Sequence, residues 1–517
     1  MKRVISILLC LMMLAGMLTG CTAAGEPGEY IPVGDQLAQE DAEMQEQTEP
    51  GENEEGFAMA YNPAEPLNPL SAADTTNRLL FSLVYQGLFT TDRDGDVLPI
   101  LCKNYTASED LMVYDFTIDP KATFSDGVPV TPEDVVASLK ESMNHKYYGR
   151  RLRFVNVIEV TEDREVRIYL LQPNGNLPLL LDIPIVKATE IESENPLGTG
   201  PYKFKGWGTH RTLVRRDNWW CESDDLKVNF PEISLVAAET AAEVRDAFEF
   251  FGADLVCADP GSDLYAEYRC DYELWDCDNG FFVYLAINEE SAVFQNAEIR
   301  RAISRGINRD LLADKYYRGF AKGAALPASP NSPFYTPALA KQYDYDPTAY
   351  QAAMSTVKGY SIKLLVNASD SLRLRVAQEI GRMLNSSGLL VEIDARTEDY
   401  YYGALRNGEY DMYLGQTKLS PNMDLSVFFA ENGPLNYGGL DDVGMYTLCL
   451  QAIENQGEYY TLHQAVMEDG YLCPIVFRSY AIYATRGILD DLQPARDNVF
   501  CYSIGKRLTD AYVVQGS

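Results

Sequence analysis

The stretch from residue 361 to residue 394 constrains the fold more than any other part of the sequence. It opens with an apolar, β-branched run, SIKLLVN (361–367), which predicts a strand. The next apolar residues recur every four positions and predict one buried face of a helix: Leu372, Val376, Ile380 and Leu384. Gly388 ends that helix, and LLVEID (389–394) predicts a second strand. A strand–helix–strand unit favours a parallel sheet, so we expect an α/β fold.

The segment 124–143, FSDGVPVTPEDVVASLKESM, contains a well-marked helix start. Thr131 is a natural N-cap, Pro132 suits the first helical position, and Asp134 sits where a capping box needs an acceptor. The buried stripe of this helix is predicted to be Val135, Leu139 and Met143. Just before it, VYDFTI (113–118) alternates apolar and polar residues like a half-buried strand.

The first 21 residues predict an export signal that ends in a lipidation site. Lys2 and Arg3 precede an apolar run that, at sixteen residues (4–19), is shorter than the roughly 20 needed to span a bilayer. Leu18-Thr19-Gly20-Cys21 resembles a bacterial lipobox, which implies cleavage after residue 20 and a lipid on the Cys21 thiol. Residues 22–56 carry eleven Asp or Glu and no Lys or Arg, so we expect residues 21–56 to be an extended, disordered acidic spacer.

Charge and size restrict the remaining chain. The formal net charge is −33 and becomes −35 when Lys2 and Arg3 leave with the signal, which argues against nucleic-acid binding. The body from residue 57 has roughly 460 residues, more than one hydrophobic core supports, so two or three domains are expected.

The cysteines and histidines give no sign of a metal or catalytic centre. Without Cys10 and Cys21, eight cysteines remain: Cys102, Cys221, Cys257, Cys270, Cys277, Cys449, Cys473 and Cys501. An even number in an exported protein permits disulfides, and buried free thiols are the alternative; no C-x-x-C pair occurs. His145, His210 and His463 are scattered without ligand spacing, and no H-E-x-x-H or G-x-S-x-G motif is present. We therefore expect no metal, no cofactor and no enzymatic activity.

Two motifs that suggest ligands fail on their details. DRDGD (92–96) is not a calcium loop of the EF-hand type, because Val97 and Lys103 stand where Gly and Glu are required. A hairpin turn at Asp94-Gly95 is the better interpretation. In NPLGTGPYKFKGW (195–207) the glycines precede a strand rather than a helix, which excludes a phosphate loop.

Four segments in order resemble one family. They are LVYQGLFTTDRDGDVLPILCKNY, FSDGVPVTPEDVVASL, LGTGPYKFKGW and INEESAVFQNAEIRRAISRGINRD. Together they resemble the family 5 extracellular solute-binding proteins of bacterial ABC importers, over about residues 57–510. The resemblance implies a periplasmic-binding-protein-like fold of two hinged lobes around a cleft, plus a third domain. The implied boundaries are a discontinuous lobe of residues 57–85, 198–288 and 478–517, an extra domain of 86–197, and another lobe of 289–477.

The same resemblance implies a function. The chain is expected to be a monomeric binding lipoprotein that captures a peptide or peptide-like solute and delivers it to an ABC permease. It would be anchored by its lipid alone on the outer face of the cytoplasmic membrane. The alternatives are a non-peptide solute such as a sugar or a nickel chelate, a receptor for a peptide signal, and, more remotely, a secreted hydrolase.

The family's ligand contacts map onto two segments. The first ligand loop follows LNPL (67–70), which places Asp74 and Thr75 in the cleft. In peptide binders a Trp, an amine-gripping Asp and a later Asp precede two paired aromatics. Counting back from Phe428-Phe429, these three places fall at Lys418, Pro421 and Asp424, with Asn422 between them. A free N-terminal amine is therefore not held in the usual way, since a buried ammonium without a counter-charge is costly.

Other candidates could replace the missing carboxylate or form the cleft wall. Asp74, Glu398 or Asp399 could take the amine, or Lys418 could bind a carboxylate; a plain surface lysine is the alternative. Tyr400 or Tyr401, from EDYYYG (398–403), would supply an aromatic wall. Phe282 and Tyr284 are either further cleft residues or core residues.

Overall fold

The computed structural model describes residues 56–496 apart from 73–74, 93–94, 207–209, 222–229, 438–441, 489–491 and 493. Residues 1–54 and 55–517 form two separate units, and the description below concerns the second. The signal segment, Cys21, most of the acidic spacer and Cys501 lie outside the described residues. Within the described residues, every helix is too short or too polar to cross a membrane.

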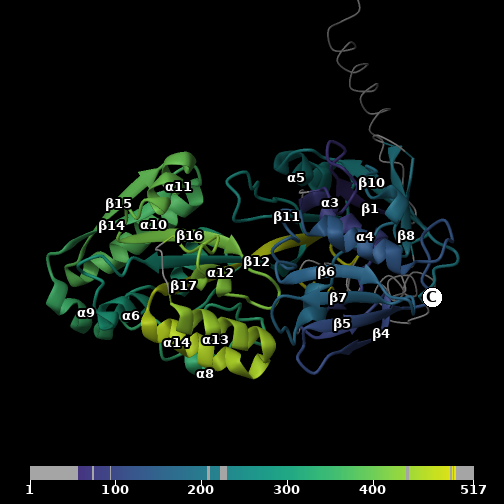
Figure 1. Ribbon diagram of the computed structural model, residues 1–517. Helices are drawn as coiled ribbons and strands as arrows, with labels where there is room; N and C mark the ends of the chain where they lie inside the picture. The colour runs from purple at the N-terminus through teal and green to yellow at the C-terminus, as the bar shows by residue number, and fades with distance from the viewer. Residues whose placement is uncertain are drawn as a thin grey trace, which may run out of the picture. The chain divides into compact units, whose positions relative to one another are not determined.

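In the described part of the chain, eleven strands form one large sheet (Figure 1). These strands are β1 Phe57–Tyr61, β8 Tyr202–Lys205, β9 Thr212–Arg215, β10 Glu232–Ala237, β11 Leu255–Ala258, β12 Glu273–Ile287, β13 Ala321–Gly323, β14 Ser361–Asn367, β15 Leu390–Arg396, β16 Met412–Lys418 and β17 Leu472–Ala484. Their order is β15-β14-β16-β12-β17-β11-β1-β10-β9-β8, and β13 pairs with β17 outside this path. Only β12 and β17 connect the two ends of the order, so the sheet consists of two halves joined by two strands.

We call one half of the sheet the second lobe: β14, β15 and β16 with their helices. The helices are α6 Ala297–Arg305, α7 Arg309–Tyr317, α8 Pro337–Ala340, α9 Pro347–Met354, α10 Ser371–Leu384, α11 Glu398–Arg406, α12 Ser426–Phe429, α13 Val443–Glu454 and α14 Tyr459–Asp469. The predicted strand–helix–strand unit is confirmed as β14, α10 and β15, and the two strands pair in parallel. The predicted helix stripe is buried throughout, and Gly388 adopts φ 89° just after the helix.

Helices cover both faces of the second lobe's sheet, as an α/β fold requires. Val283, Leu285 and Ile287 of β12 pack on one face with α6, α7, α9 and α10. The alternate residues Phe282 and Tyr284 point to the other face and pack with α11–α14. The two candidate aromatics of β12 are therefore core residues, fully or almost fully buried.

We call the other half the first lobe: β11, β1, β10, β9 and β8, with helices α3 Thr75–Val84 and α5 Ala241–Phe250. The central strand β1 pairs in parallel with both β10 and β11. Helix α5 begins at the N-cap Thr240, whose hydroxyl accepts a hydrogen bond from the backbone N–H of Glu243 at 3.2 Å.

Residues 86–197, which we call the insert, form a separate small sheet. Its elements are β2 Phe89–Thr91, β3 Val97–Pro99, β4 Cys102–Ala107, β5 Val113–Ile118, α4 Pro132–Ser142, β6 Val155–Val160 and β7 Val166–Leu170. The four strands β4-β5-β7-β6 are antiparallel, and β2 and β3 form the predicted hairpin. The predicted capping box at Thr131 and Asp134 is confirmed. The predicted stripe is wrong at Met143, which is 37% exposed because the helix ends one residue earlier.

The insert and the first lobe share one hydrophobic core. Phe116 and Ile168 of the insert belong to the same buried cluster as Leu83 and Tyr202 of the first lobe. Buried Arg216 also joins them, since its guanidinium donates to the carbonyl of Phe124 in the insert (2.8 Å) and of Thr199 in the first lobe (3.0 Å). We therefore treat the first lobe and the insert as one rigid body, called the first body.

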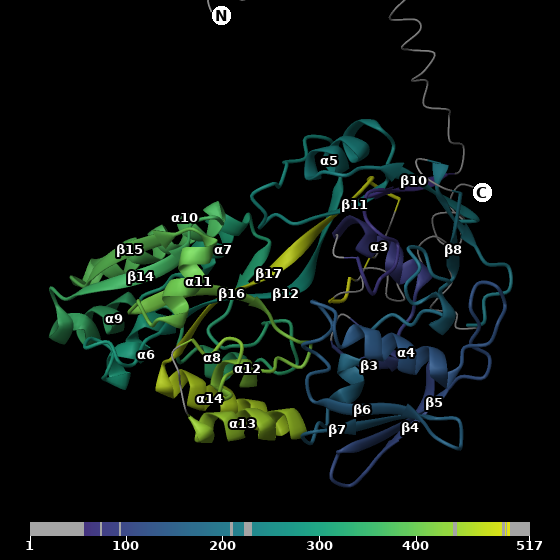
Figure 2. The same cartoon turned by 45° about the horizontal axis from the view of Figure 1, so that its top comes forward.

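The strands β12 and β17 run from the first lobe into the second lobe (Figures 1 and 2). Their pairing is interrupted between the two lobes, where the register shifts between Asp278 and Phe282 of β12. Gly280, inside this interruption, adopts φ 72°, and its N–H donates to the Asp278 carboxylate at 2.7 Å. A local break in an otherwise continuous strand pair is where two bodies can rotate with least loss of pairing, so we refer to residues 278–282 as the candidate hinge.

Candidate functional site

Tyr147 of the insert is the point at which all three parts of the described chain meet. The guanidinium carbon of Arg78, from α3 of the first lobe, lies 4.7 Å from the centre of the Tyr147 ring. The ammonium of Lys418, from the end of β16 in the second lobe, lies 3.8 Å from the same ring centre and also donates to the Tyr147 hydroxyl. Arg151 of the insert approaches to 5.2 Å. Three cations thus contact one aromatic ring, an arrangement that cation–π attraction favours.

Local structure after helix α4 positions Tyr147. The Nδ1 atom of His145 accepts hydrogen bonds from the backbone N–H groups of Tyr147 at 3.1 Å and Tyr148 at 3.2 Å. Burial, together with the nearby Arg78 and Arg151, lowers the pKa of His145, which keeps its imidazole neutral and able to accept. Arg151 is fixed in turn by an ion pair with Asp182. The ring is therefore held before any solute arrives.

A further cation, Arg478 of β17, lies beside residues 278–282 and contacts both the first lobe and the second lobe. Its guanidinium forms a two-pronged ion pair with Asp259 of the first lobe, with N···O distances of 2.6 and 2.8 Å. It also donates to Gln416 of the second lobe at 2.9 Å and covers the Phe281 ring at 5.1 Å. Arg478 is 5% exposed, so these contacts are made away from solvent.

The loop that follows β16 carries polar contacts between the second lobe and the insert. Asp424 forms an ion pair with Arg153 of the insert at 2.9 Å, and Arg150 of the insert donates to the Thr417 hydroxyl at 2.7 Å. Asp424 also accepts from the backbone N–H of Ser426 at 2.8 Å, which starts the short helix α12. Charged and polar groups thus join the two bodies at this loop, and Leu179 of the insert also packs in the buried cluster of the second lobe.

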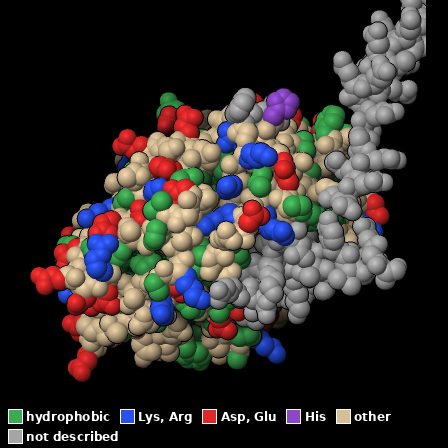
Figure 3. Space-filling model, turned by 90° about the vertical axis from the view of Figure 1, so that its right-hand side faces the viewer, with side chains coloured by type: hydrophobic (Ala, Val, Ile, Leu, Met, Phe, Trp, Pro, Cys, Tyr) green, Lys and Arg blue, Asp and Glu red, His purple; other side chains and the backbone are tan. Residues whose placement is uncertain are grey.

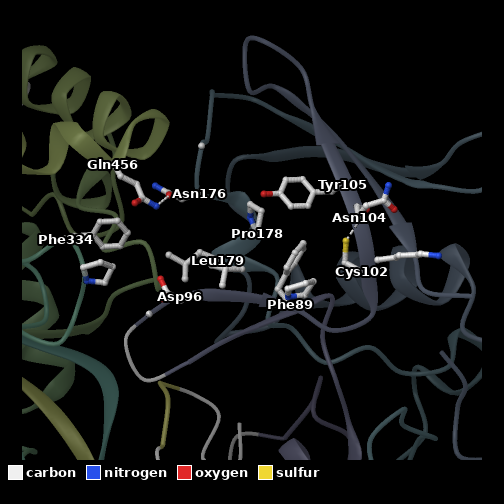
Figure 4. Close-up of a pocket in the computed structure, with 16 residues that line it drawn as sticks. Phe89, Asp96, Cys102, Asn104, Tyr105, Asn176, Pro178, Leu179, Phe334 and Gln456 are labelled. Carbon is white, nitrogen blue, oxygen red and sulfur yellow. Dashed lines mark hydrogen bonds between the residues drawn. The ribbon is translucent and has the colours of Figure 1, made fainter. Parts of the chain in front are cut away.

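Two neighbouring cavities lie along the same boundary. The larger, of about 540 Å³, is lined by the insert and by Pro333, Phe334 and Gln456 of the second lobe (Figure 4). The smaller, of about 240 Å³, is lined by Pro421 and Met423 of the loop after β16 and reaches Asp276 and Asp278 of β12. The two share Gly95, Leu179, Pro333 and Phe334 in their walls.

The structure brings together some of the predicted site residues and separates others. Lys418 contacts Tyr147, Asp424 contacts Arg153, and Pro421 lines the smaller cavity, so this predicted segment does lie between the bodies. Asn422 is buried, and its side-chain oxygen accepts from the Ser420 hydroxyl at 2.7 Å.

The segment at the start of α11 is mostly exposed. Glu398, Asp399 and Tyr400 are exposed, whereas Tyr401 is buried and donates its hydroxyl to the carbonyl of Leu414 at 3.0 Å. Of the first ligand loop, Asp74 lies outside the described residues; Thr75 begins α3, and its side chain is not described. The ligand-binding roles of all these residues stay predictions.

The site residues that sequence reasoning missed are mostly basic. Arg78, Arg150, Arg153 and Arg478 all join two parts of the molecule. A signal for two of them was present: four of the eight residues from 146 to 153 are Lys or Arg in a chain of net charge −33. Figure 3 shows acidic and basic side chains interspersed on one face of the molecule.

The described part of the chain contains free thiols but no grouped metal ligands. Within residues 56–496, omitting the undescribed gaps, no three His, Cys, Asp or Glu side chains are grouped to hold a metal ion. Cys102, Cys270, Cys449 and Cys473 carry free thiols. Burial raises the pKa of the Cys102 thiol to about 12, which makes it a poor nucleophile.

Comparisons with known proteins place the chain among solute-binding proteins. The family model described as bacterial extracellular solute-binding proteins, family 5 Middle, matches residues 96–434. The glutathione-binding protein GsiB of Salmonella typhi is 24% identical over 351 residues, which cover 64% of this chain and 67% of that protein. The nickel-binding periplasmic protein of Escherichia coli is 23% identical over 394 residues, 69% of this chain and 74% of that protein. A putative peptide-binding protein AppA from Clostridium difficile has the same fold, with a TM-score of 0.69 at 18% identity over 87% of this chain and 99% of that one.

Proposed function

Since the chain belongs to family 5 of the bacterial extracellular solute-binding proteins, we propose that it is the substrate-binding component of an ABC importer. It captures a peptide or peptide-like solute outside the cytoplasmic membrane and releases it chemically unchanged to the permease. Its task is binding and not turnover.

One observation carries this proposal: the first lobe, the insert and the second lobe all supply side chains to the Tyr147 ring. A solute at this junction touches both bodies at once, which makes its binding energy available to hold them together. Rotation about residues 278–282 separates Lys418 from Tyr147 and opens the site. Binding then shifts the population toward the closed form, as in other hinged binding proteins.

The sequence departure at Pro421 specifies how a peptide is held. Pro421 stands where peptide binders place the Asp that grips the α-ammonium, and it offers no charge. Lys418 stands nearby with a positive charge and contacts the junction. We therefore expect N-terminal acetylation to leave peptide affinity unchanged, while removing the C-terminal or side-chain carboxylate weakens it.

The test is native mass spectrometry of the purified protein offered a mixture of short peptides, each present in free and N-acetylated form, together with the Ni(L-His)₂ chelate. Retention of one solute per protein, released intact on unfolding, is the expected result. Lys418→Ala reduces retention, whereas Lys341→Ala, an exposed lysine at the end of α8, leaves it unchanged. Retention of the chelate alone identifies a metal-chelate binder, and a product of altered mass overturns the binding role.

The proposed location rests on the lipobox-like segment that ends at Cys21. A lipid on this thiol anchors the chain, while the acidic residues after it keep the folded body away from the bilayer. Metabolic labelling with a fatty acid tests this. Wild-type protein takes the label and sediments with membranes; a Cys21→Ser variant that is labelled equally contradicts the anchor.

A further inference from the structure

We propose that the cavity of about 540 Å³ between the insert and the second lobe is a second binding compartment, for an uncharged aromatic group that carries a hydrogen-bond acceptor. An aromatic residue within a peptide has this chemistry, with its ring as the apolar part and its carbonyl as the acceptor. The compartment depends on the proposed function only in that the two bodies close on a solute. It is separate from the Tyr147 junction, because its lining includes neither Tyr147 nor Arg78, Arg151 or Lys418, which contact that ring.

The position and size of the cavity fit a ligand site. Its volume lies within the roughly 300–1,000 Å³ typical of small-molecule pockets. Phe89 and Leu179 of the insert form one wall, and Phe334 with Gln456 of the second lobe forms the other (Figure 4). Leu179 and Phe334 belong to the same buried cluster, whereas the lining residues Lys103, Asn104 and Tyr105 of β4 are exposed. A ligand therefore enters the cavity from the β4 side.

The aromatic side chains of the walls pack on neighbouring rings. The ring centre of Phe89 lies 5.7 Å from that of Tyr105 and 5.9 Å from that of Phe116, both in edge-to-face geometry. On the opposite wall, Phe334 packs on Tyr459 at 4.2 Å. Tyr105 directs its hydroxyl toward the side of the cavity where Asn176 lies (Figure 4). Such pre-positioned rings bind another ring without first having to order themselves.

A buried amide supplies the polar specificity. Asn176 is 4% exposed, and its side-chain oxygen accepts a hydrogen bond from Gln456 of the other body. Its backbone N–H donates to Asn174 at 2.8 Å, which fixes the residue. The Nδ2 group of Asn176 has no hydrogen-bond partner among the described residues. A buried donor without an acceptor is unfavourable, so a ligand that presents a carbonyl oxygen here is favoured over a purely apolar one.

Charges near the compartment disfavour an anionic ligand. The larger cavity is lined by one charge of each sign, Asp96 and Lys103. The neighbouring cavity, which shares part of its wall, is lined by three carboxylates, Asp92, Asp276 and Asp278, and one guanidinium, Arg496. This neighbouring excess of negative charge disfavours a carboxylate-bearing ligand relative to its neutral amide.

The experiment compares two probes that differ only in charge, N-acetyl-L-phenylalaninamide and N-acetyl-L-phenylalanine, by saturation-transfer NMR and titration against the purified protein. The amide is expected to bind at least about fivefold more tightly than the acid. Asn176→Ala is expected to lower the affinity for the amide probe about three- to tenfold, because one hydrogen bond is lost. Asn104→Trp fills the cavity from an exposed position of β4 and is expected to abolish binding without disturbing a core.

Two controls separate this proposal from the proposed function. Lys341→Ala, an exposed lysine that lines neither cavity, leaves amide binding unchanged. The absence of binding by either probe at millimolar concentration overturns the compartment, as does binding that survives Asn104→Trp in a protein whose melting temperature is normal. If peptide retention persists in those cases, the proposed function stands and only the compartment is overturned. If the probe binds but no peptide is retained, the compartment stands and the proposed function is overturned.

Discussion

The ion pair between Arg153 and Asp424 is expected to hold the closed form together, and Asp424→Asn tests this. The pair joins the insert to the second lobe with an N···O distance of 2.9 Å, and its side chains are 22% and 7% exposed. Asparagine keeps the volume of the aspartate and the acceptor for the Ser426 N–H, so the local loop is preserved while the charge is lost. Opening separates the two groups and returns them to water, so the change acts mainly on the closed form.

The magnitude follows from the geometry. At 2.9 Å and an effective dielectric constant of 20, the attraction is about 6 kcal/mol before desolvation is subtracted. The contact is an ion pair without hydrogen-bond geometry, because Nη2 of Arg153 has no hydrogen-bond partner in the described chain, so the net gain lies well below this value. The partial exposure of Arg153 lowers this further, and we take about 1–2 kcal/mol. The ratio of closed to open protein is then expected to fall about five- to thirtyfold.

Small-angle scattering and solute titration read out this change. Asp424→Asn is expected to raise the radius of gyration measured at a solute concentration that half-saturates the wild-type protein, and to weaken the binding of that solute, because the competent fraction is smaller. The matched control is Asp115→Asn, which removes a two-pronged ion pair with Arg167 at 2.6 and 2.8 Å that lies wholly within the insert. If both variants change affinity by less than twofold and leave the radius of gyration unchanged, the pair does not govern closure.

Three further predictions concern the folded state. Gly280→Ala is expected to lower the free energy of unfolding in urea by about 1–3 kcal/mol, because φ is 72° and the new Cβ would lie 2.2 Å from the Arg496 guanidinium. Gly319→Ala is the control, with φ 81° and open space around it. An equal loss in both variants would show that the Arg496 contact is unimportant. Burial lowers the pKa of His463 to about 3, and neither ring nitrogen has a partner in the described chain. The unfolded chain therefore binds a proton that the folded chain does not between pH 6.5 and 3, and the free energy of unfolding should fall as the pH drops through this window, less steeply in His463→Met. Cys102, Cys449 and Cys473 are at most 2% exposed, so iodoacetamide is expected to modify them only after denaturation; rapid modification in the native protein contradicts this burial.

Sequence patterns predicted the local elements well because they depend on short-range chemistry. The unit of β14, α10 and β15 follows from apolar periodicity, and the capping box at Thr131 follows from side-chain chemistry within one turn. Met143 failed because a periodic stripe does not show where a helix ends. The parallel pairing of β1 with β10 and the joining of β12 to β17 depend on contacts between distant segments. Such pairings leave no periodic signal in a single sequence.

The candidate site was predicted in part. Lys418 and Asp424 contact Tyr147 and Arg153 of the insert, and their expected role as ligand contacts in the interlobe cleft stays a prediction. Phe282 and Tyr284 alternate with residues of the opposite face, but alternation does not tell a core face from a cleft face. Tyr147 and Arg153, the partners of Lys418 and Asp424, lie some 270 residues earlier in the chain. Their role depends on how the insert packs, which residue spacing does not reveal.

The central claim is that a solute closes the first body onto the second lobe about residues 278–282. Small-angle scattering of the protein, with and without the peptide that it retains most tightly, tests this most directly. We expect the radius of gyration to fall on binding, and to fall less in Lys418→Ala at the same peptide concentration. The claim would be contradicted if the saturated complex gave the same scattering curve as a solute-free protein that is shown to be open.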